Sequence, residues 1–224
     1  MTDRRELPTY TISEAAHYLS VPATTIRYWS VGRNHYPPLI DVASAGPPTL
    51  VSFLNLTELH VLSVLRRKHQ VRMPAVREAI EHLSRLAPTP IDARHPLVSR
   101  VLETDGVHVF TDYYGQLINL GRSGQAAIRE VIAGALARIE RDPGGIPIKL
   151  YPFTRHSIRN APALVLIDPA LSGGRPVIAG TGLCTRIIFE RYKLGESISG
   201  LADDYERPST EIEEAIRCEL EAAA

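Results

Sequence analysis

Residues 11–29 read TISEAAHYLSVPATTIRYW, and their pattern is the most informative one in the N-terminal part of the chain. Thr11 followed by Glu14 has the spacing of a helix capping box, and the apolar residues after Thr11 recur on one helical face. The proline in the middle is suited to the start of a second helix, in which Ile26 and Trp29 are spaced to point inward. The stretch therefore predicts two short helices joined by a tight turn.

The next segment predicts a hairpin and two longer helices. PPLIDVASAGPPTLVSF (residues 37–53) contains two β-type runs around Ala45-Gly46-Pro47-Pro48, so we expect a hairpin in the position of a wing. Thr57 is predicted to cap a helix that ends in the basic run Arg66-Arg67-Lys68, and Pro74 is predicted to start another. The core-facing residues of these two helices are expected at Leu59, Leu62, Leu65, Val76, Ile80 and Leu83.

This order of helix, turn, helix, wing, helix and helix, together with the IRYW element, resembles the winged helix-turn-helix domain of the MerR family over most of residues 9–86. The resemblance implies that the second helix enters the major groove of DNA and that Arg27 and Tyr28 contact the backbone. It also places Thr24 and Thr25 where contacts to base edges or phosphates are expected. The DNA-contacting set predicted on this basis is Thr11, Ala23, Thr24, Thr25, Arg27, Tyr28 and Arg33.

The chain departs from that family in two places. Its wing offers SAGPP (residues 44–48) where basic side chains usually bind phosphates, so the contribution of the wing to DNA affinity stays open. No sustained heptads follow Leu86, so we do not expect the long dimerising coiled coil of the family or its ligand or metal site. The alternative interpretation of the whole module is a small helical domain that packs without touching DNA.

The middle of the chain, residues 87–158, predicts a small sheet packed by one helix. Asp105-Gly106 is a hairpin turn signal between the runs VSRVLET and VHVFTDYY, and a third strand is expected at residues 116–120. QAAIREVIAGALARIERD is predicted to be a helix that Pro143-Gly144-Gly145 stops, and IPIKLYPFT a closing strand. The helix is expected to bury Ile128, Ile132, Leu136 and Ile139. We assign no function to this module.

Residues 167–220 read IDPALSGGRPVIAGTGLCTRIIFERYKLGESISGLADDYERPSTEIEEAIRCEL. PVIAGT is a β-type run, RIIFERYKL is a predicted helix closed by Gly195, Ser197 is suited to cap the next helix, and Thr210 with Glu213 forms a capping box for the last. The pattern resembles the small domain called domain of unknown function four-three-three, which is described as antitoxin-like, of the VapB type. The resemblance implies a toxin partner, expected to be a PIN-like ribonuclease.

The last predicted helix is acidic, which argues against DNA contact there. It bears Glu211, Glu213, Glu214, Glu219 and Glu221 against Arg217 alone, and phosphates would be repelled by that face. The face is interpreted as protein-binding or dimerising, with a solvated acidic helix as the alternative. The partner-binding residues are expected at Arg175, Val177, Ile178 and Arg186, where the two arginines could face the carboxylates of a ribonuclease.

Charge divides the chain in the same way as the motifs. Residues 1–86 hold ten Lys/Arg against seven Asp/Glu, residues 87–158 eight against seven, and residues 159–224 seven against eleven. The proline-containing runs at 87–96 and 160–170 mark the two boundaries. We therefore predict three modules, residues 1–86, 87–158 and 159–224, in an α+β fold that is mainly α, and we expect the basic end to meet DNA.

Several classes of function lack a sequence signal. GGRPVIAGTG lacks the GK[ST] end of a phosphate-binding loop, and the eight histidines form no HxxxH pair. Cys184 and Cys218 form no CxxC pair, so no metal, cofactor or disulfide is expected. No GxSxG motif or close Ser/His/Asp grouping appears, which makes an enzyme the minority hypothesis. No apolar segment reaches about 18 residues, so we expect a cytoplasmic protein without a membrane contact.

Two functional hypotheses remain. In the first, the chain is the antitoxin of a type II toxin-antitoxin pair, which neutralises a PIN-like ribonuclease and represses its own operon as a homodimer on double-stranded operator DNA. In the second, it is a stand-alone dimeric MerR-like transcriptional regulator without a toxin. The neighbouring reading frame distinguishes them, because a small ribonuclease encoded there favours the first.

Overall fold

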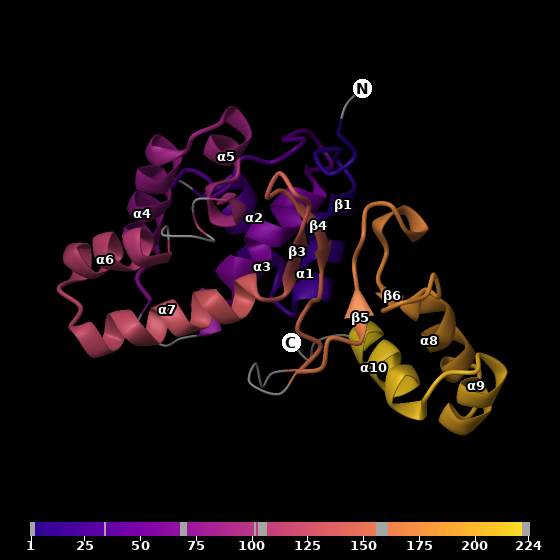
Figure 1. The fold of residues 1–224 in the computed structure, drawn as a ribbon. Coiled ribbons are helices and arrows are strands. Elements are labelled where there is room, and N and C mark those ends of the chain that lie inside the picture. The colour runs from indigo at the N-terminus through magenta and orange to yellow at the C-terminus, as the bar shows by residue number, and fades with distance from the viewer. Residues whose placement is uncertain are drawn as a thin grey trace.

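The computed structural model describes residues 3–33, 35–67, 71–100, 102, 107–155 and 161–220. The fold is mainly helical with small antiparallel sheets, which confirms the expected α+β class (Figure 1). The helices are α1 (Ile12–Leu19), α2 (Ala23–Val31), α3 (Phe53–Arg67), α4 (Met73–Leu86), α5 (Pro90–Arg94), α6 (Val107–Ile118), α7 (Arg122–Leu136), α8 (Thr185–Lys193), α9 (Ile198–Asp204) and α10 (Ser209–Glu219), with 3-10 turns η1 (Pro96–Val98) and η3 (Ser172–Gly174). The strands form the pairs β1 (Tyr10–Thr11) with β2 (Leu50–Val51), β3 (Ile139–Arg141) with β4 (Pro147–Leu150), and β5 (Val165–Leu166) with β6 (Val177–Ile178).

Helix α3 lies at the centre of the larger core. Every residue from Phe53 to Leu65 is buried, and α1, α7 and η1 all pack against this helix. The same core continues through α4, α6 and α7 to Ile167. Residues on both sides of position 86 therefore share one core, and the module boundary expected there stays a prediction.

The start of α3 differs from the expectation. Ser52 and Asn55 cap it reciprocally, because the Asn55 N–H donates to Ser52 Oγ at 3.1 Å and the Ser52 N–H donates to Asn55 Oδ1 at 3.1 Å. Thr57 lies one turn inside the helix, where its buried hydroxyl donates to the carbonyls of Phe53 and Leu54. The prediction of a cap at Thr57 is therefore wrong. The helix begins four residues earlier, at Phe53, where Ser52 and Asn55 form the cap.

Two of the strands expected in the middle of the chain, VHVFTDYY and residues 116–120, are wrong as well. Helix α6 occupies VHVFTDYY, and residues 116–120 form the end of that helix and the turn after it. The run alternates locally, but Val107, Phe110, Thr111 and Tyr114 also follow helical spacing, and all four are buried. The expected turn at Asp105-Gly106 lies outside the described residues.

Helix α7 confirms the predicted helix but ends earlier. Ile128 and Ile132 are buried as expected, and the helix stops at Leu136. Ile139 belongs to β3 instead, because Pro143-Gly144-Gly145 forms the turn between β3 and β4 and does not terminate the helix. Strand β4 confirms part of the expected IPIKLYPFT strand.

Helices α8, α9 and α10 form a smaller unit with its own core around Ile188, Leu201 and Ile212, seen as the gold group in Figure 1. Ser197 caps α9 as predicted, its hydroxyl accepting the Gly200 N–H. The capping box expected at Thr210 is wrong, because α10 begins at Ser209 after Pro208 and has no side-chain cap.

The acidic face of α10 is largely turned inward. Glu214 is fully buried and accepts hydrogen bonds from Thr154 and Arg155, while Glu219 accepts from Thr185. Glu211 pairs with Arg207 at 2.7 Å. A solvated acidic face is thus the wrong description, since most of these carboxylates have intramolecular partners.

The C-terminal unit, taken as η3, β6 and helices α8 to α10 (residues 172–219), meets the first helix of the chain through specific polar contacts. The Tyr10 hydroxyl donates to the Gly174 carbonyl at 2.9 Å, and Arg175 forms an ion pair with Glu14. His17 lies 3.7 Å from the carboxylate of Glu219. These contacts join segments more than 150 residues apart and fix the position of α1 against the C-terminal unit.

Candidate nucleic-acid interface

The arrangement of α1 and α2 at the N-terminus is built by local capping and turn chemistry. Thr11 Oγ1 accepts the Glu14 N–H at 3.2 Å, and Glu14 accepts the Thr11 N–H at 2.9 Å, so the predicted capping box is confirmed. Ser20 has φ 51°, a left-handed conformation that ends α1 sharply. Pro22 then precedes α2, and the buried side chains of Ile26 and Trp29 pack this helix against the core.

Helix α2 presents one face to solvent. Ala23, Thr24 and Arg27 are exposed on it, while Thr25 and Tyr28 are half-buried. Arg33 is exposed in the segment that follows. The structure therefore gathers six of the seven predicted DNA-contacting residues on α2 and directly after it.

Thr11, the seventh predicted contact residue, lies elsewhere. It is half-buried at the beginning of α1, and its hydroxyl is engaged with Glu14. The carboxylate of Glu14 also binds Arg175, and these interactions hold the pKa of Glu14 below its usual value although burial alone would raise it. Thr11 thus has a structural task in the capping box, and its role in DNA contact stays a proposal.

Arg66 is a residue of this surface that the predicted set does not include. It is exposed near the C-terminus of α3, and its Nη1 donates to Thr25 Oγ1 in the first turn of α2. From the sequence, Arg66 was predicted only as part of the basic run that ends a helix. A contact between residues 41 positions apart depends on how α3 packs beside α2, which the sequence pattern does not state.

The distribution of carboxylates is a sequence signal that marks this surface. Residues 15–40 and 59–77 contain no Asp or Glu. The two segments carry Arg27, Arg33, Arg66, Arg67, Lys68, Arg72 and Arg77.

The positive charges near α2 are therefore not neutralised by the carboxylates that the structure describes. Among the described residues, no carboxylate pairs with Arg27, Arg33 or Arg66, whereas Arg175 and Arg191 of the C-terminal part are both paired. Uncompensated cations on an exposed face favour an anionic partner, and a phosphate backbone is the commonest extended one.

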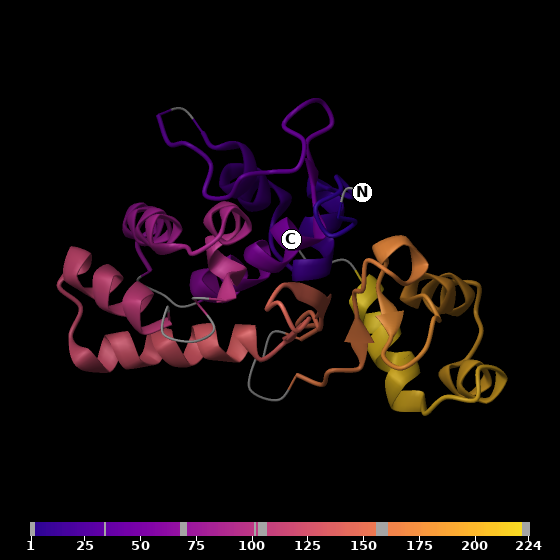
Figure 2. The same ribbon diagram turned by 45° about the horizontal axis from the view of Figure 1, so that its top comes forward.

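The expected wing is short and uncharged. Ser44 and Leu50 form a single antiparallel bridge, with N···O distances of 3.0 and 2.9 Å, and β2 pairs with β1 after it. Figure 2 shows two purple loops, one after α2 and one before β2, that project from the same side of the molecule. Residues 42–57 contain no charged side chain, so this wing offers shape and hydrogen bonds but no cations.

The predicted partner-binding residues have two different environments. Val177 and Ile178 are 0% exposed in β6, so their side chains do not reach a partner in this structure. Arg186 is 79% exposed on α8, and its nearest carboxylate is Glu190 at 4.0 Å. Arg175 is half-exposed and engaged with α1. The partner-binding role thus stays a proposal for the two arginines, while the two apolar residues support the sheet beneath them.

A groove of about 790 Å³ separates α1 from α8. Its lining includes His17 and Tyr18 from α1 and Arg175, Arg186 and Lys193 from the C-terminal unit. Both arginines that we expected to meet a partner therefore face one concave surface between the two ends of the chain.

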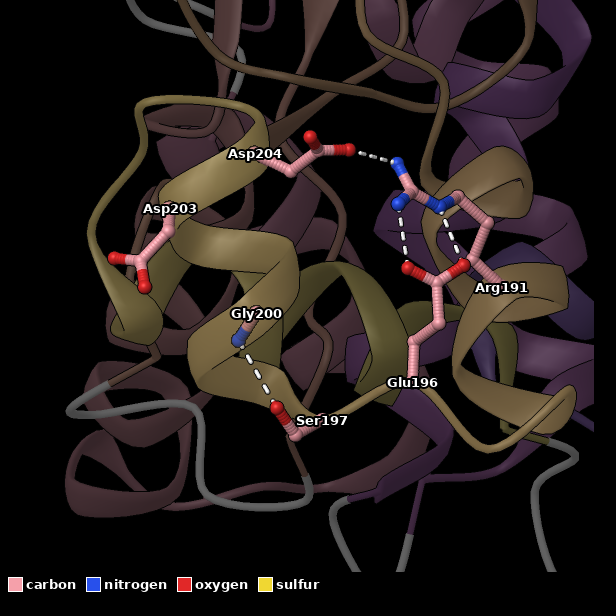
Figure 3. Close-up of a pocket in the computed structure, with 6 residues that line it drawn as sticks. All are labelled: Arg191, Glu196, Ser197, Gly200, Asp203 and Asp204. Atoms are coloured by element: carbon pink, nitrogen blue, oxygen red, sulfur yellow. Dashed lines mark hydrogen bonds and ion pairs between the residues drawn. The ribbon is translucent and has the colours of Figure 1, made fainter.

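A second hollow, of about 560 Å³, lies between α8 and α9 (Figure 3). Arg191 donates to Glu196 at 2.7 Å and to Asp204 at 2.6 Å, so its charge is satisfied inside the unit and its pKa is raised by these carboxylates. Asp203 adds further negative charge to the lining, and this end of the molecule would repel phosphates.

The described residues also bear on two other kinds of site. No group of three or more His, Cys, Asp or Glu side chains in this part of the chain has the arrangement of a metal site. Within the same residues, no helix combines the length and the apolar character needed to span a bilayer.

Comparisons with known proteins concern both the C-terminal unit and the whole chain. Residues 165–217 match the family model described as "Protein of unknown function (DUF433)", which confirms the resemblance of that region. A Mycobacterium tuberculosis protein named "Putative antitoxin VapB45" is 27% identical over 227 residues, which cover 90% of this chain and 90% of that protein. A crystal structure of Rv2018 from Mycobacterium tuberculosis matches with a TM-score of 0.72 at 22% identity, covering 96% of this chain and 100% of that chain. That likeness shows a shared fold, and the MerR-like interpretation of residues 9–86 stays a prediction.

Proposed function

We propose that this chain is a non-enzymatic, antitoxin-type regulator that binds operator DNA through α2 and holds a toxin through its C-terminal unit. The observation that carries the DNA-binding half is the exposed face of α2, where Arg27 and, directly after the helix, Arg33 pair with no carboxylate of the described residues. The name of the mycobacterial relative and the family match of residues 165–217 support the antitoxin half. The proposed toxin is a PIN-like ribonuclease, and Arg175 and Arg186 are the proposed contacts to it.

The proposed DNA complex contains two copies of the chain. A single α2 helix spans too few base pairs for useful specificity, so a homodimer on a pseudo-palindromic operator is expected. The half-sites should then be separated by whole turns of the double helix. Light scattering at micromolar concentration measures the mass directly, and a strictly monomeric chain contradicts this arrangement.

The DNA-binding half is tested by substituting Arg27 in the full chain. Arg27→Ala should weaken binding to the DNA upstream of the coding region by about 1–3 kcal/mol, because a charge-assisted bond to a phosphate is lost. Arg186→Ala is the matched control, since it removes an exposed arginine from the far unit. Equal gel-shift affinities of the wild type and Arg27→Ala contradict the proposed placement of α2.

The antitoxin half is tested by co-expression of the full chain with the product of the adjacent reading frame. A stable complex that lacks ribonuclease activity supports the proposal. A chain that binds its upstream DNA but forms no such complex is instead the stand-alone regulator, with the C-terminal unit serving dimerisation.

A further inference from the structure

The contact between Arg66 and Thr25 joins two helices at the proposed DNA surface. Arg66 lies in the last turn of α3, and Thr25 lies in the first turn of α2. The guanidinium donates from Nη1 to the Thr25 hydroxyl oxygen. Arginine has five N–H donors, so this bond leaves most of the guanidinium available to another acceptor.

The backbone that carries Arg66 is held rigidly. Helix α3 is buried from Phe53 to Leu65, and Arg66 is its first exposed residue. The side chain therefore leaves the core at a fixed point next to α2. A guanidinium anchored in this way loses less conformational freedom on binding an anion than one on a mobile loop.

None of the carboxylates that the structure describes neutralises Arg66. One turn earlier on α3, at the positions three and four residues before it, Arg66 has Ser63 and Leu62, so this part of the helix offers it no acidic partner. Across the described part of the chain, no ion pair to Arg66 is formed. An exposed cation that is fixed in position but has no counter-charge is suited to a phosphate group.

The bond also determines what Thr25 can do. Because a guanidinium can only donate, the Thr25 oxygen acts as the acceptor in this contact. Its own proton then remains available to a phosphate oxygen or to an acceptor on a base edge. Arg66 thus positions Thr25 as a hydrogen-bond donor toward the nucleic acid.

We infer that Arg66 is a DNA-phosphate contact of this protein and that it also orients Thr25 for its own contact. This inference rests on the proposed DNA-binding function. It extends the DNA surface from one helix to two, since α3 supplies a cation that the wing lacks.

The experiment uses the full chain and a fluorescently labelled duplex of random sequence, titrated at several salt concentrations. Each phosphate contact contributes about 0.9 to the slope of log K against log salt. Arg66→Ala should therefore give a slope about 0.9 shallower than the wild type, and Arg66→Lys should restore it. Arg122→Ala, which removes an exposed arginine at the start of α7, is the control and should leave the slope unchanged.

The orientation of Thr25 is tested in the same assay. Thr25→Val should weaken binding of the wild type several-fold without changing the salt slope, and it should have a smaller effect in the Arg66→Ala background. Equal effects in both backgrounds overturn the positioning role. Thermal unfolding of each variant checks that the fold is retained, which we expect because Arg66 is exposed.

The outcomes separate this inference from the proposed function. If the wild type shows no salt-dependent binding to the duplex, the DNA-binding function itself is overturned. If Arg27→Ala flattens the slope and Arg66→Ala leaves it at the wild-type value, the function stands and the assignment of Arg66 is overturned.

Discussion

Glu14→Ala tests how α1 is fixed at the junction of the two ends of the chain. The Glu14 carboxylate accepts the Thr11 N–H at 2.9 Å and also forms an ion pair with Arg175. One side chain therefore caps the first helix and binds the C-terminal unit. Removing it should lower the free energy of unfolding through both interactions.

The magnitude follows from the exposure of the groups. A lost cap interaction costs about 1 kcal/mol. The Arg175 ion pair adds about 0.2–1 kcal/mol, because both side chains are partly exposed to solvent. The sum is about 1–2 kcal/mol, which corresponds to about 2–8 °C in Tm for a chain of this length. Arg175→Ala removes the ion pair without the cap, so it should cost less.

Equilibrium urea denaturation of the full-length variants measures these differences. Glu78→Ala, at an exposed position of α4, is the control and should behave like the wild type. A wild-type transition midpoint for Glu14→Ala refutes the reasoning, as does an equal loss in Arg175→Ala and Glu14→Ala.

The effect of Glu14 should also depend on pH. Its pKa in the folded chain lies below the usual 4.5, so its stabilisation is complete above that pH and is lost as the pH falls through the folded value. The difference between the wild type and Glu14→Gln should therefore shrink in acid.

Two further predictions concern the core and the same junction. Gly174→Ala should destabilise the chain by about 2 kcal/mol or more, because Gly174 has φ +79° and a Cβ there would lie 2.5 Å from the Tyr10 hydroxyl oxygen. Gly173→Ala, at φ +62° with open space around its Cβ, should cost less in the same urea titration, and equal losses contradict the steric argument. The unfolding free energy of the wild type should fall as pH rises above about 6.5, because the pKa of His95 is higher in the folded chain than in the unfolded one. Burial alone would lower the pKa of His95, but the 3.0 Å hydrogen bond between His95 and Glu58 outweighs burial and raises this pKa. Denaturation at pH 6 and pH 8.5 should show this fall in the wild type and a weaker one in His95→Gln.

Local chemistry made the starts of α1 and α9 predictable from sequence. The capping box at Thr11 and the cap at Ser197 each depend on residues within three positions of one another, and the structure confirms both. The segment around α6 was predicted wrongly because Val107, Phe110 and Tyr114 satisfy helical spacing within a run that also alternates. Only packing against α4 and α7 selects the helix there.

The proposed site was predictable in part for the same reason. The exposed positions of α2 follow from its helical period once Ile26 and Trp29 are placed inside. The contact of Arg66 with α2 and the burial of Glu214 could not be predicted in this way, because each residue has a partner 41 or more residues away in the chain. The composition of α10 shows how many carboxylates the helix carries, but it does not show which of them are paired within the chain.

The polar junction between α1 and the C-terminal unit limits how such a unit can be exchanged between proteins. Consider a recombined chain in which a foreign segment replaces residues 161–220. The Tyr10 hydroxyl keeps its hydrogen-bond acceptor only if the new segment places a backbone carbonyl where that of Gly174 lies. The recombined chain keeps the charge balance of Glu14 only if the incoming segment carries a cation at position 175. A chimera should therefore fold best when Tyr10 and Glu14 are exchanged together with the C-terminal segment, so that both ends of the chain come from the same protein.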